Sequence, residues 1–169
     1  MYLCIFNGPA MRLTRFTDIG LRVLIYLSRA REAQASVTVG EIASQFDISV
    51  HHLVKVVGHL VRAGWVQTTR GRNGGMRLCI EASALKVGTV LRELEGDAEL
   101  ADCDSQGCRL NKNCRLRDAL QVGLHAFYDA MNAYTLQDIT EGATGEQIVH
   151  MHRTFLGQSP QVRTDSSIN

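Results

Sequence analysis

No apolar run in this chain of 169 residues approaches the roughly 18 residues that a membrane-spanning helix needs. The first ten residues are apolar, but they lack the basic segment that opens a secretory signal peptide. The sequence also has no Ser/His/Asp set, no paired carboxylates and no nucleotide-binding glycine loop. We therefore expect a cytoplasmic protein that is not an enzyme and has no membrane partner.

A net charge of +1 hides an asymmetry between the two halves of the chain. Residues 1–80 contain ten Lys/Arg against four Asp/Glu, whereas residues 81–169 contain eight against thirteen. A basic half suits a polyanionic partner such as nucleic acid. The alternative explanation is that an imbalance of this size arose by chance.

Two short amphipathic helices are predicted over residues 39–46 and 50–63, with Thr38 and Ser49 as their caps and Gly64 as the end of the second. Joined by a turn, they form a helix-turn-helix, whose second helix meets base edges with its N-terminal end. The residues of this end that we expect to contact DNA are Ser49, His51, His52 and Lys55.

A β-hairpin is predicted over residues 65–80, directly after the second helix, and it makes the domain a winged helix. Its tip spans residues 70–75, where an Asn-Gly pair is the turn signal. Arginines on a glycine-rich tip can lie against phosphates or enter a minor groove, although charge that is merely solvated is the alternative. The tip residues that we expect to contact DNA are Arg70, Arg72 and Asn73.

Three further helices are predicted over residues 14–30, 85–94 and 115–134. The last carries an apolar stripe that includes Leu116, Gly123 and Phe127. A small domain has little core left to cover this stripe, so we expect it to pair with the same helix of a second copy. Packing within its own domain is the alternative.

The predicted fold is therefore mainly α, a winged helix-turn-helix DNA-binding domain with a long dimerisation helix. We expect residues 1–10 to be a dispensable extension and residues 11–96 to form the DNA-binding domain, with the helix-turn-helix at about 38–63 and the wing at about 65–80. A loop over 97–114, a dimerisation segment over 115–142 and a disordered tail over 143–169 complete the plan. His150 and His152 of this tail are expected to be exposed.

Three cysteines, Cys103, Cys108 and Cys114, lie within twelve residues, with four residues in the first gap and five in the second. Loop-forming residues separate them, so the segment is predicted to hold three thiols near one another. Zinc usually takes four ligands, and no second Cys pair or nearby His supplies the fourth. A thiol–disulfide switch leaves one thiol unexplained, whereas an iron–sulfur cluster accepts irregular spacing. The spacing favours a cluster and leaves zinc and redox chemistry open.

Three motifs resemble the iron–sulfur winged-helix regulators that include NsrR and IscR, and the resemblance covers roughly residues 11–142. The motifs are Arg-Leu-Thr-Arg-Phe-Thr-Asp-Ile-Gly-Leu-Arg-Val-Leu-Ile-Tyr-Leu over residues 12–27, the Arg-Gly-Arg-Asn-Gly-Gly wing over 70–75 and the triple-cysteine loop. The cysteine gaps resemble those of the nitric-oxide-sensing, NsrR-like branch. IscR-like members have a longer first gap and a His ligand shortly after the third Cys, where this chain has Arg-Leu-Arg-Asp over 115–118.

The resemblance implies that Cys103, Cys108 and Cys114 bind an iron–sulfur cluster, of either the 2Fe-2S or the 4Fe-4S type. It implies Asp18 of the partner subunit as the fourth ligand, although a carboxylate that only stabilises its own helix start is the alternative. Arg22, one turn further on, is placed to pair with Asp18 when the carboxylate is released.

The implied function is a homodimeric repressor that binds a palindromic operator in double-stranded DNA and releases it when nitric oxide arrives, so that detoxification genes are expressed. We expect the cluster-bound dimer to hold its recognition helices about one DNA turn, ~34 Å, apart. Loss of Asp18 as a ligand would spoil that spacing. The alternatives are a regulator that senses cluster supply or redox state, and a zinc-structured winged-helix regulator.

Overall fold

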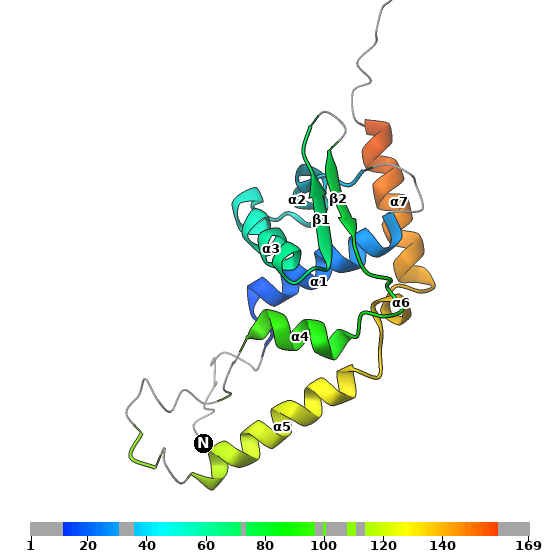
Figure 1. Cartoon of the computed structure of the whole chain (residues 1–169). Helices are drawn as coiled ribbons and strands as arrows, with labels where there is room; N and C mark the ends of the chain where they lie inside the picture. Colours follow the sequence, from blue (N-terminus) through cyan, green and yellow to red (C-terminus); the bar gives the residue numbers. More distant parts are fainter. Residues whose placement is uncertain are drawn as a thin grey trace, which may run out of the picture.

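The computed structural model of the chain describes residues 12–30, 36–71, 74–96, 100, 108–110 and 114–158. This part of the chain is mainly helical, with one two-stranded sheet (Figure 1). In chain order its elements are α1 (Arg15–Ala30), α2 (Val39–Phe46), α3 (Val50–Arg62), β1 (Val66–Thr69), β2 (Gly75–Leu78), α4 (Val87–Glu95), α5 (Arg115–Met131), α6 (Leu136–Ile139) and α7 (Ala143–Gln158). Among the described residues, no helix is both long and apolar enough to cross a membrane. The predicted extension over residues 1–10 lies outside them.

The predicted helix-turn-helix is present as α2 and α3. Thr38 caps α2, because its hydroxyl accepts a hydrogen bond from the backbone N–H of Glu41 at 3.1 Å. Asp47 turns the chain between the two helices with φ 50°, in the left-handed region. The N–H of Ile48 then donates to the carbonyl of Ala43 at 2.9 Å, which closes the turn.

α3 is the amphipathic second helix of this unit. Its buried residues are Leu53, Val56, Val57 and Leu60. Gly64 follows the end of α3 with φ 76°, a conformation that its position in the sequence predicted. Ser49 is the N-cap residue of α3 as predicted, but its side chain makes no cap hydrogen bond among the described residues. The exposed Ser49 side chain is therefore available to a DNA ligand.

The predicted wing is an antiparallel hairpin in which Val66 pairs with Leu78 and Thr69 with Gly75. It is attached to the segment before α2, because the N–H of Met76 donates to the carbonyl of Val37 at 2.7 Å. A side chain at Gly75 would collide with this segment, so the close crossing of the two backbones requires glycine. Residues 72–73 of the tip lie outside the described residues.

α1 runs through the middle of the molecule and contacts elements from both halves of the chain (Figure 1). Val23, Leu24 and Tyr26 on this helix are completely buried. They share one apolar core with Ile42 of α2 and Leu53 of α3. A shift of α1 would therefore displace the helix-turn-helix as well, because well-packed cores transmit displacement rather than absorb it.

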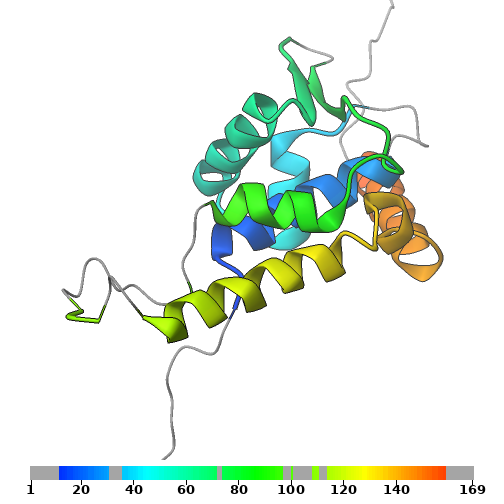
Figure 2. The same ribbon diagram turned by 60° about the horizontal axis from the view of Figure 1, so that its bottom comes forward.

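α5 lies along α4 and extends beyond it, away from the main core (Figures 1 and 2). Val87 and Leu91 of α4 and Tyr128 of α5 form a small second core there, which Leu124 and Met131 partly cover. One side of α5 is thus packed within the chain. Other apolar residues of the helix stay exposed, among them Leu116 at 65% and Phe127 at 42%.

The structure corrects the predicted end of this helix from residue 134 to Met131, and the segment 115–142 contains a second short helix, α6. The cause is a backbone pairing with the start of α4. The N–H of Val87 donates to the carbonyl of Tyr134 at 2.9 Å, and the N–H of Leu136 to that of Leu85 at 2.8 Å. This pairing needs an extended chain, so the helix stops before it.

The prediction of a disordered tail over residues 143–169 is wrong for residues 143–158, which form α7. α7 packs against α1 (Figure 1), with Ile148 only 4% exposed. His152 is completely buried, contrary to the prediction, whereas His150 is exposed as predicted. Tertiary packing stabilises this helix although its own apolar pattern is weak. The remaining residues of the predicted tail, 159–169, lie outside the described part.

Candidate DNA interface and cysteine loop

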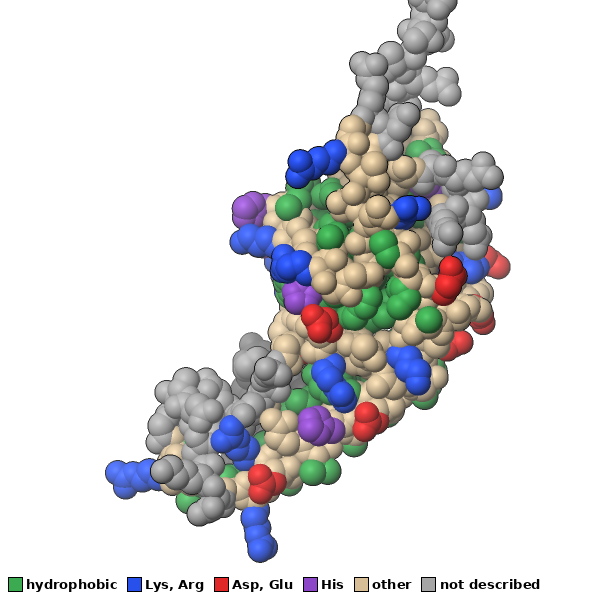
Figure 3. Space-filling view, viewed as in Figure 1, with side chains coloured by type: hydrophobic (Ala, Val, Ile, Leu, Met, Phe, Trp, Pro, Cys, Tyr) green, Lys and Arg blue, Asp and Glu red, His purple; other side chains and the backbone are tan. Residues whose placement is uncertain are grey.

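The N-terminal half of α3 presents polar side chains to solvent. His51, His52 and Lys55 are exposed there, together with Ser49 just before the helix. Figure 3 shows Lys, Arg and His side chains along the edge formed by α3 and the wing, whereas most Asp and Glu side chains in that view lie elsewhere. A cationic edge at the start of a recognition helix is suited to a DNA backbone. Contact of these four residues with DNA stays a prediction.

The described part of the wing contains two exposed arginines, Arg70 and Arg77. Arg70 is exposed at the end of β1, and the other two predicted tip residues, Arg72 and Asn73, lie outside the described residues. Arg77 on the return strand is held across the hairpin by Gln67, whose side-chain oxygen accepts from its Nη2 at 2.8 Å and its Nε at 3.2 Å. Of these two described arginines, Arg77 is oriented by Gln67, and Arg70 is exposed at the tip side of the hairpin.

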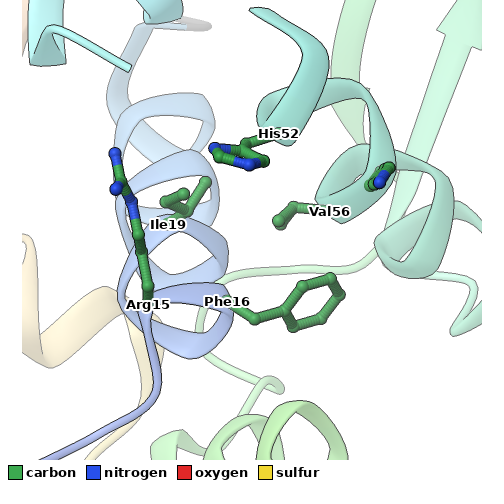
Figure 4. Close-up of a pocket in the computed structure, with 6 residues that line it drawn as sticks. Arg15, Phe16, Ile19, His52 and Val56 are labelled. Atoms are coloured by element: carbon green, nitrogen blue, oxygen red, sulfur yellow. The ribbon is translucent and has the colours of Figure 1, made fainter. Parts of the chain in front are cut away.

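Sequence reasoning missed a basic residue beside the recognition helix, Arg15 at the start of α1. A cavity of about 170 Å³ lies between α1 and α3. It is lined by Arg15, Phe16, Ile19, His52, Lys55 and Val56. Figure 4 shows the Arg15 side chain extending along α1 and His52 pointing from α3 toward it. Arg15 directly precedes the apolar face of α1 in the sequence, but only the packing of α1 on α3 brings it beside His52 and Lys55.

Apolar and aromatic side chains in the contact between α1 and α3 hold the two helices together. The Phe16 ring meets the His59 ring edge-on, with centroids 5.4 Å apart. His59 in turn contacts Glu93 of α4, Nε2 to Oε1 at 3.1 Å. The start of α1 is also fastened to the end of α4, because the N–H of Thr14 donates to Glu95 Oε1 at 2.9 Å. The first turn of α1 therefore lies between the recognition helix and the point where the cysteine loop begins.

Asp18 and Arg22 form an ion pair on the exposed surface of α1. Arg22 Nε lies 3.0 Å from Asp18 Oδ1 and 3.1 Å from Oδ2, and the two side chains are 44% and 49% exposed. Thr14, not Asp18, caps the helix, since its hydroxyl accepts from the N–H of Thr17 at 3.2 Å. Arg22 thus contacts Asp18 in the structure, and the carboxylate is half exposed; the roles of Asp18 as a ligand and of Arg22 as a switch stay predictions.

The described part of the cysteine loop contains two of its three thiols. Cys108 is exposed, and Cys114 is half-buried at the N-cap of α5 without a side-chain cap hydrogen bond. Cys103 lies outside the described residues. Within those residues, no three His, Cys, Asp or Glu side chains gather closely enough to hold a metal ion. The structure therefore does not place the predicted three-thiol set.

The donor chemistry of the chain nevertheless fits an iron–sulfur cluster. Thiolates are the usual ligands of such clusters, and neither described loop thiol is committed to a disulfide. The start of α5 favours a negatively charged ligand at Cys114, because helix N-termini carry partial positive charge. An exposed carboxylate such as Asp18 adds an oxygen donor.

A family model described as Rrf2, iron-dependent transcriptional regulator, matches residues 13–142. The chain belongs to the Rrf2 family. It is therefore a transcriptional regulator and not an enzyme, as the sequence predicted. Rrf2 regulators bind DNA and are typically dimeric. The matched residues include α1 to α6 and end before α7.

Solved structures with a similar fold include two CymR proteins. Staphylococcus aureus CymR in its oxidized form is 25% identical, with a TM-score of 0.61, and the match covers 79% of this chain and 98% of that one. CymR of B. subtilis, described as a global cysteine regulator, is 26% identical with a TM-score of 0.54, covering 77% and 96%. The IscR of T. potens, at 21% identity and TM-score 0.63 over 82% and 92%, shares the fold. Rrf2 membership alone thus leaves the signal of this chain open.

We expect replacement of Arg15 by alanine to weaken binding to duplex DNA about tenfold. The slope of log affinity against log salt concentration should fall by about one, as for the loss of one phosphate contact. The measurement is fluorescence anisotropy at several salt concentrations, with a duplex that the wild-type protein selects from a random pool. Arg62→Ala is the matched control, because Arg62 is exposed at the opposite end of α3. Equal effects of the two substitutions would remove Arg15 from the interface.

Proposed function

We propose that this Rrf2 regulator is an iron–sulfur-dependent repressor that senses nitric oxide and controls genes for nitric-oxide detoxification. The observation that carries the proposal is the exposed pair of Asp18 and Arg22 on α1. A structural ion pair this accessible contributes little to stability. An exposed pair of this kind does, however, allow the Asp18 carboxylate to leave Arg22 and bind a metal centre of another subunit.

Cys103, Cys108 and Cys114 would hold the cluster, and Asp18 of the partner subunit would be its fourth ligand. When bound, the cluster supplies iron that nitric oxide can ligate. The combination of three thiolates with one carboxylate leaves one position more weakly held than the others. Whether the cluster is of the 2Fe-2S or the 4Fe-4S type is decided by iron and sulfide counts.

Arg22 gives the released carboxylate a partner on its own helix, at the distances seen in the structure. The same turn of α1 packs Phe16 and Ile19 beside α3. We expect α1 to take one position when Asp18 is a ligand of the partner's cluster and another when Asp18 pairs with Arg22. Because α1 packs on α3, the recognition helix would then also take two positions. This supports the expectation that the ~34 Å spacing of a dimer on a palindromic operator depends on Asp18.

The homodimer that this requires is supported by α5. Its face toward α4 is covered by the chain itself, but Leu116 and Phe127 stay exposed on the neighbouring stripe. Gly123, on the same stripe, has no atom near the position of a Cβ, so a second helix can approach closely there. We propose that this stripe pairs with its copy in a second subunit.

The test is an anaerobic purification with iron, sulfide and zinc counts, followed by DNA binding before and after stoichiometric nitric oxide. We expect a brown protein that loses its absorbance and its selected duplex together. Asp18→Asn should keep the three thiols but weaken DNA binding of the cluster-loaded protein about tenfold or more, because one ligand is lost. The matched control is Asp129→Asn, an exposed carboxylate on α5.

Each alternative predicts a different result of the same experiment. DNA release on oxidation or cluster removal but not with nitric oxide would mean a sensor of redox state or cluster supply. A colourless, zinc-loaded protein would mean a structural metal site. Unchanged DNA binding after nitrosylation would contradict the proposed mechanism outright.

A further inference from the structure

Three polar side chains from distant parts of the chain meet in the core. Tyr26 of α1, Glu41 of α2 and His152 of α7 are 0%, 1% and 0% exposed. The Tyr26 hydroxyl donates to Glu41 Oε1 at 2.6 Å, and His152 Nδ1 contacts the same oxygen. Glu41 Oε2 and His152 Nε2 have no hydrogen-bond partner among the described residues. This buried cluster joins α7, which lies beyond the family match, to the first helix of the helix-turn-helix.

The orientation of Glu41 is unusual for its place in the sequence. Thr38 is the N-cap of α2 and Glu41 is the third residue of the helix, a spacing in which Glu normally returns its carboxylate to the cap N–H. Here Thr38 accepts from the Glu41 N–H, but the carboxylate turns inward to Tyr26 and His152. A surface carboxylate at this position would stabilise the helix start without any desolvation cost, so its burial calls for another role.

Burial also keeps Tyr26 a hydrogen-bond donor. Desolvation, and then the hydrogen bond to Glu41 and its charge, raise the pKa of Tyr26 far above its usual value of 10. The hydroxyl is thus protonated over the whole physiological range and holds one side of the carboxylate oxygen. Tyr26 therefore joins Glu41 to α1, and His152 joins the same carboxylate to α7.

We infer that Glu41 and His152 are positioning residues through which α7 sets the position of the DNA-reading helix. A second contact supports the same coupling, because Gln45 Nε2 of α2 donates to the Met151 carbonyl of α7 at 3.4 Å. Beyond Gln45 the tight turn at Asp47 fixes α2 against α3. A displacement of α7 would therefore change the position of α2, and through α2 the position of α3. The inference rests on DNA binding by α3, and it needs neither a cluster nor nitric oxide.

The test compares four variants of the full-length protein. His152→Ala removes the contact, His152→Gln retains a side chain that can donate to Glu41, and Glu41→Gln keeps the shape but not the charge. His150→Ala is the matched control, since it removes an exposed His from the same helix. Hydrogen exchange of α2 and α3 is measured without DNA, and affinity for the selected duplex is measured well below the Tm of each variant.

We expect His152→Ala to lose exchange protection in α2 and α3 and to bind DNA about tenfold more weakly while folded, because the buried Glu41 carboxylate keeps Tyr26 but loses its contact with α7. His152→Gln should recover most of both properties, and His150→Ala should match the wild type. If His152→Ala does not fold, Glu41→Gln decides, with an expected loss of about threefold or more in affinity.

Two results would overturn the inference. Wild-type affinity of folded His152→Ala, or of Glu41→Gln, would show that the buried cluster contributes only stability. Unchanged exchange in α2 would show that α7 does not hold this helix, whatever the DNA result. Because exchange is recorded without DNA and without nitric oxide, a failure of the proposed nitric-oxide mechanism would leave the exchange result valid.

Discussion

Replacing Gly88 with alanine is expected to lower the free energy of unfolding by about 2–4 kcal/mol and to loosen α5 from α4. Gly88 lies in the first turn of α4, where α5 crosses close by. A Cβ at this position would collide with the backbone carbonyl of Tyr128, and it would stand 2.6 Å from the Asn132 side-chain oxygen. A backbone atom cannot rotate away, so the two helices must separate.

The same substitution would break a polar contact that holds the end of α5. Asn132 Oδ1 accepts from the Thr89 N–H at 2.8 Å and from the Thr89 hydroxyl at 3.3 Å. Moving α5 outward lengthens both hydrogen bonds, each worth about 1 kcal/mol. Tyr128, the buried anchor of α5, would be displaced with them.

Urea denaturation followed by circular dichroism measures this effect, and Gly58→Ala is the matched control. Gly58 lies within α3, and a Cβ there would have no neighbour closer than the Arg62 guanidinium at 3.7 Å. Alanine should therefore stabilise at that position by up to about 1 kcal/mol, through helix propensity alone. A Gly88→Ala protein with an unchanged midpoint would mean that α4 and α5 do not pack this closely in solution.

Local signals in the sequence predicted the DNA-binding unit well. Thr38 caps α2, Gly64 follows α3, and the hairpin has the expected strands, because caps, glycines and alternation act over a few residues. The contact between Asp18 and Arg22 followed from four-residue spacing on one helix for the same reason.

Features that depend on long-range contacts were not predictable. α5 ends because residues 134–136 pair with the backbone at the start of α4. No residue within the helix itself predicts that pairing. The apolar residues of α7 form only a weak helical pattern, and one of its buried side chains is the polar His152. Its partner Glu41 lies 111 residues away. Arg15 was missed for a related reason, since only the packing of α1 on α3 places it beside the N-terminal half of α3.

The largest functional effect is expected from Phe127→Glu on the exposed stripe of α5. Phe127 is 42% exposed in the single chain, so the substitution should change the stability of a monomer by no more than about 0.5 kcal/mol. In a symmetric dimer, however, the substitution places two glutamates in one interface, since both subunits use the same patch. Burying two like charges without partners should raise the dimer dissociation constant about 100-fold or more.

Loss of the dimer would cost most of the DNA affinity, because two linked recognition helices bind a palindrome far more tightly than either alone, by about 10²-fold or more. Light scattering and anisotropy on the selected duplex measure the two effects on one sample. Val122→Glu is the matched control, since Val122 is also exposed on α5, at 69%, but helical spacing places it on a different face. If Phe127→Glu stays dimeric, or if Val122→Glu dissociates instead, the second subunit uses another surface, and Asp18 would have to reach the partner's cluster by a different geometry.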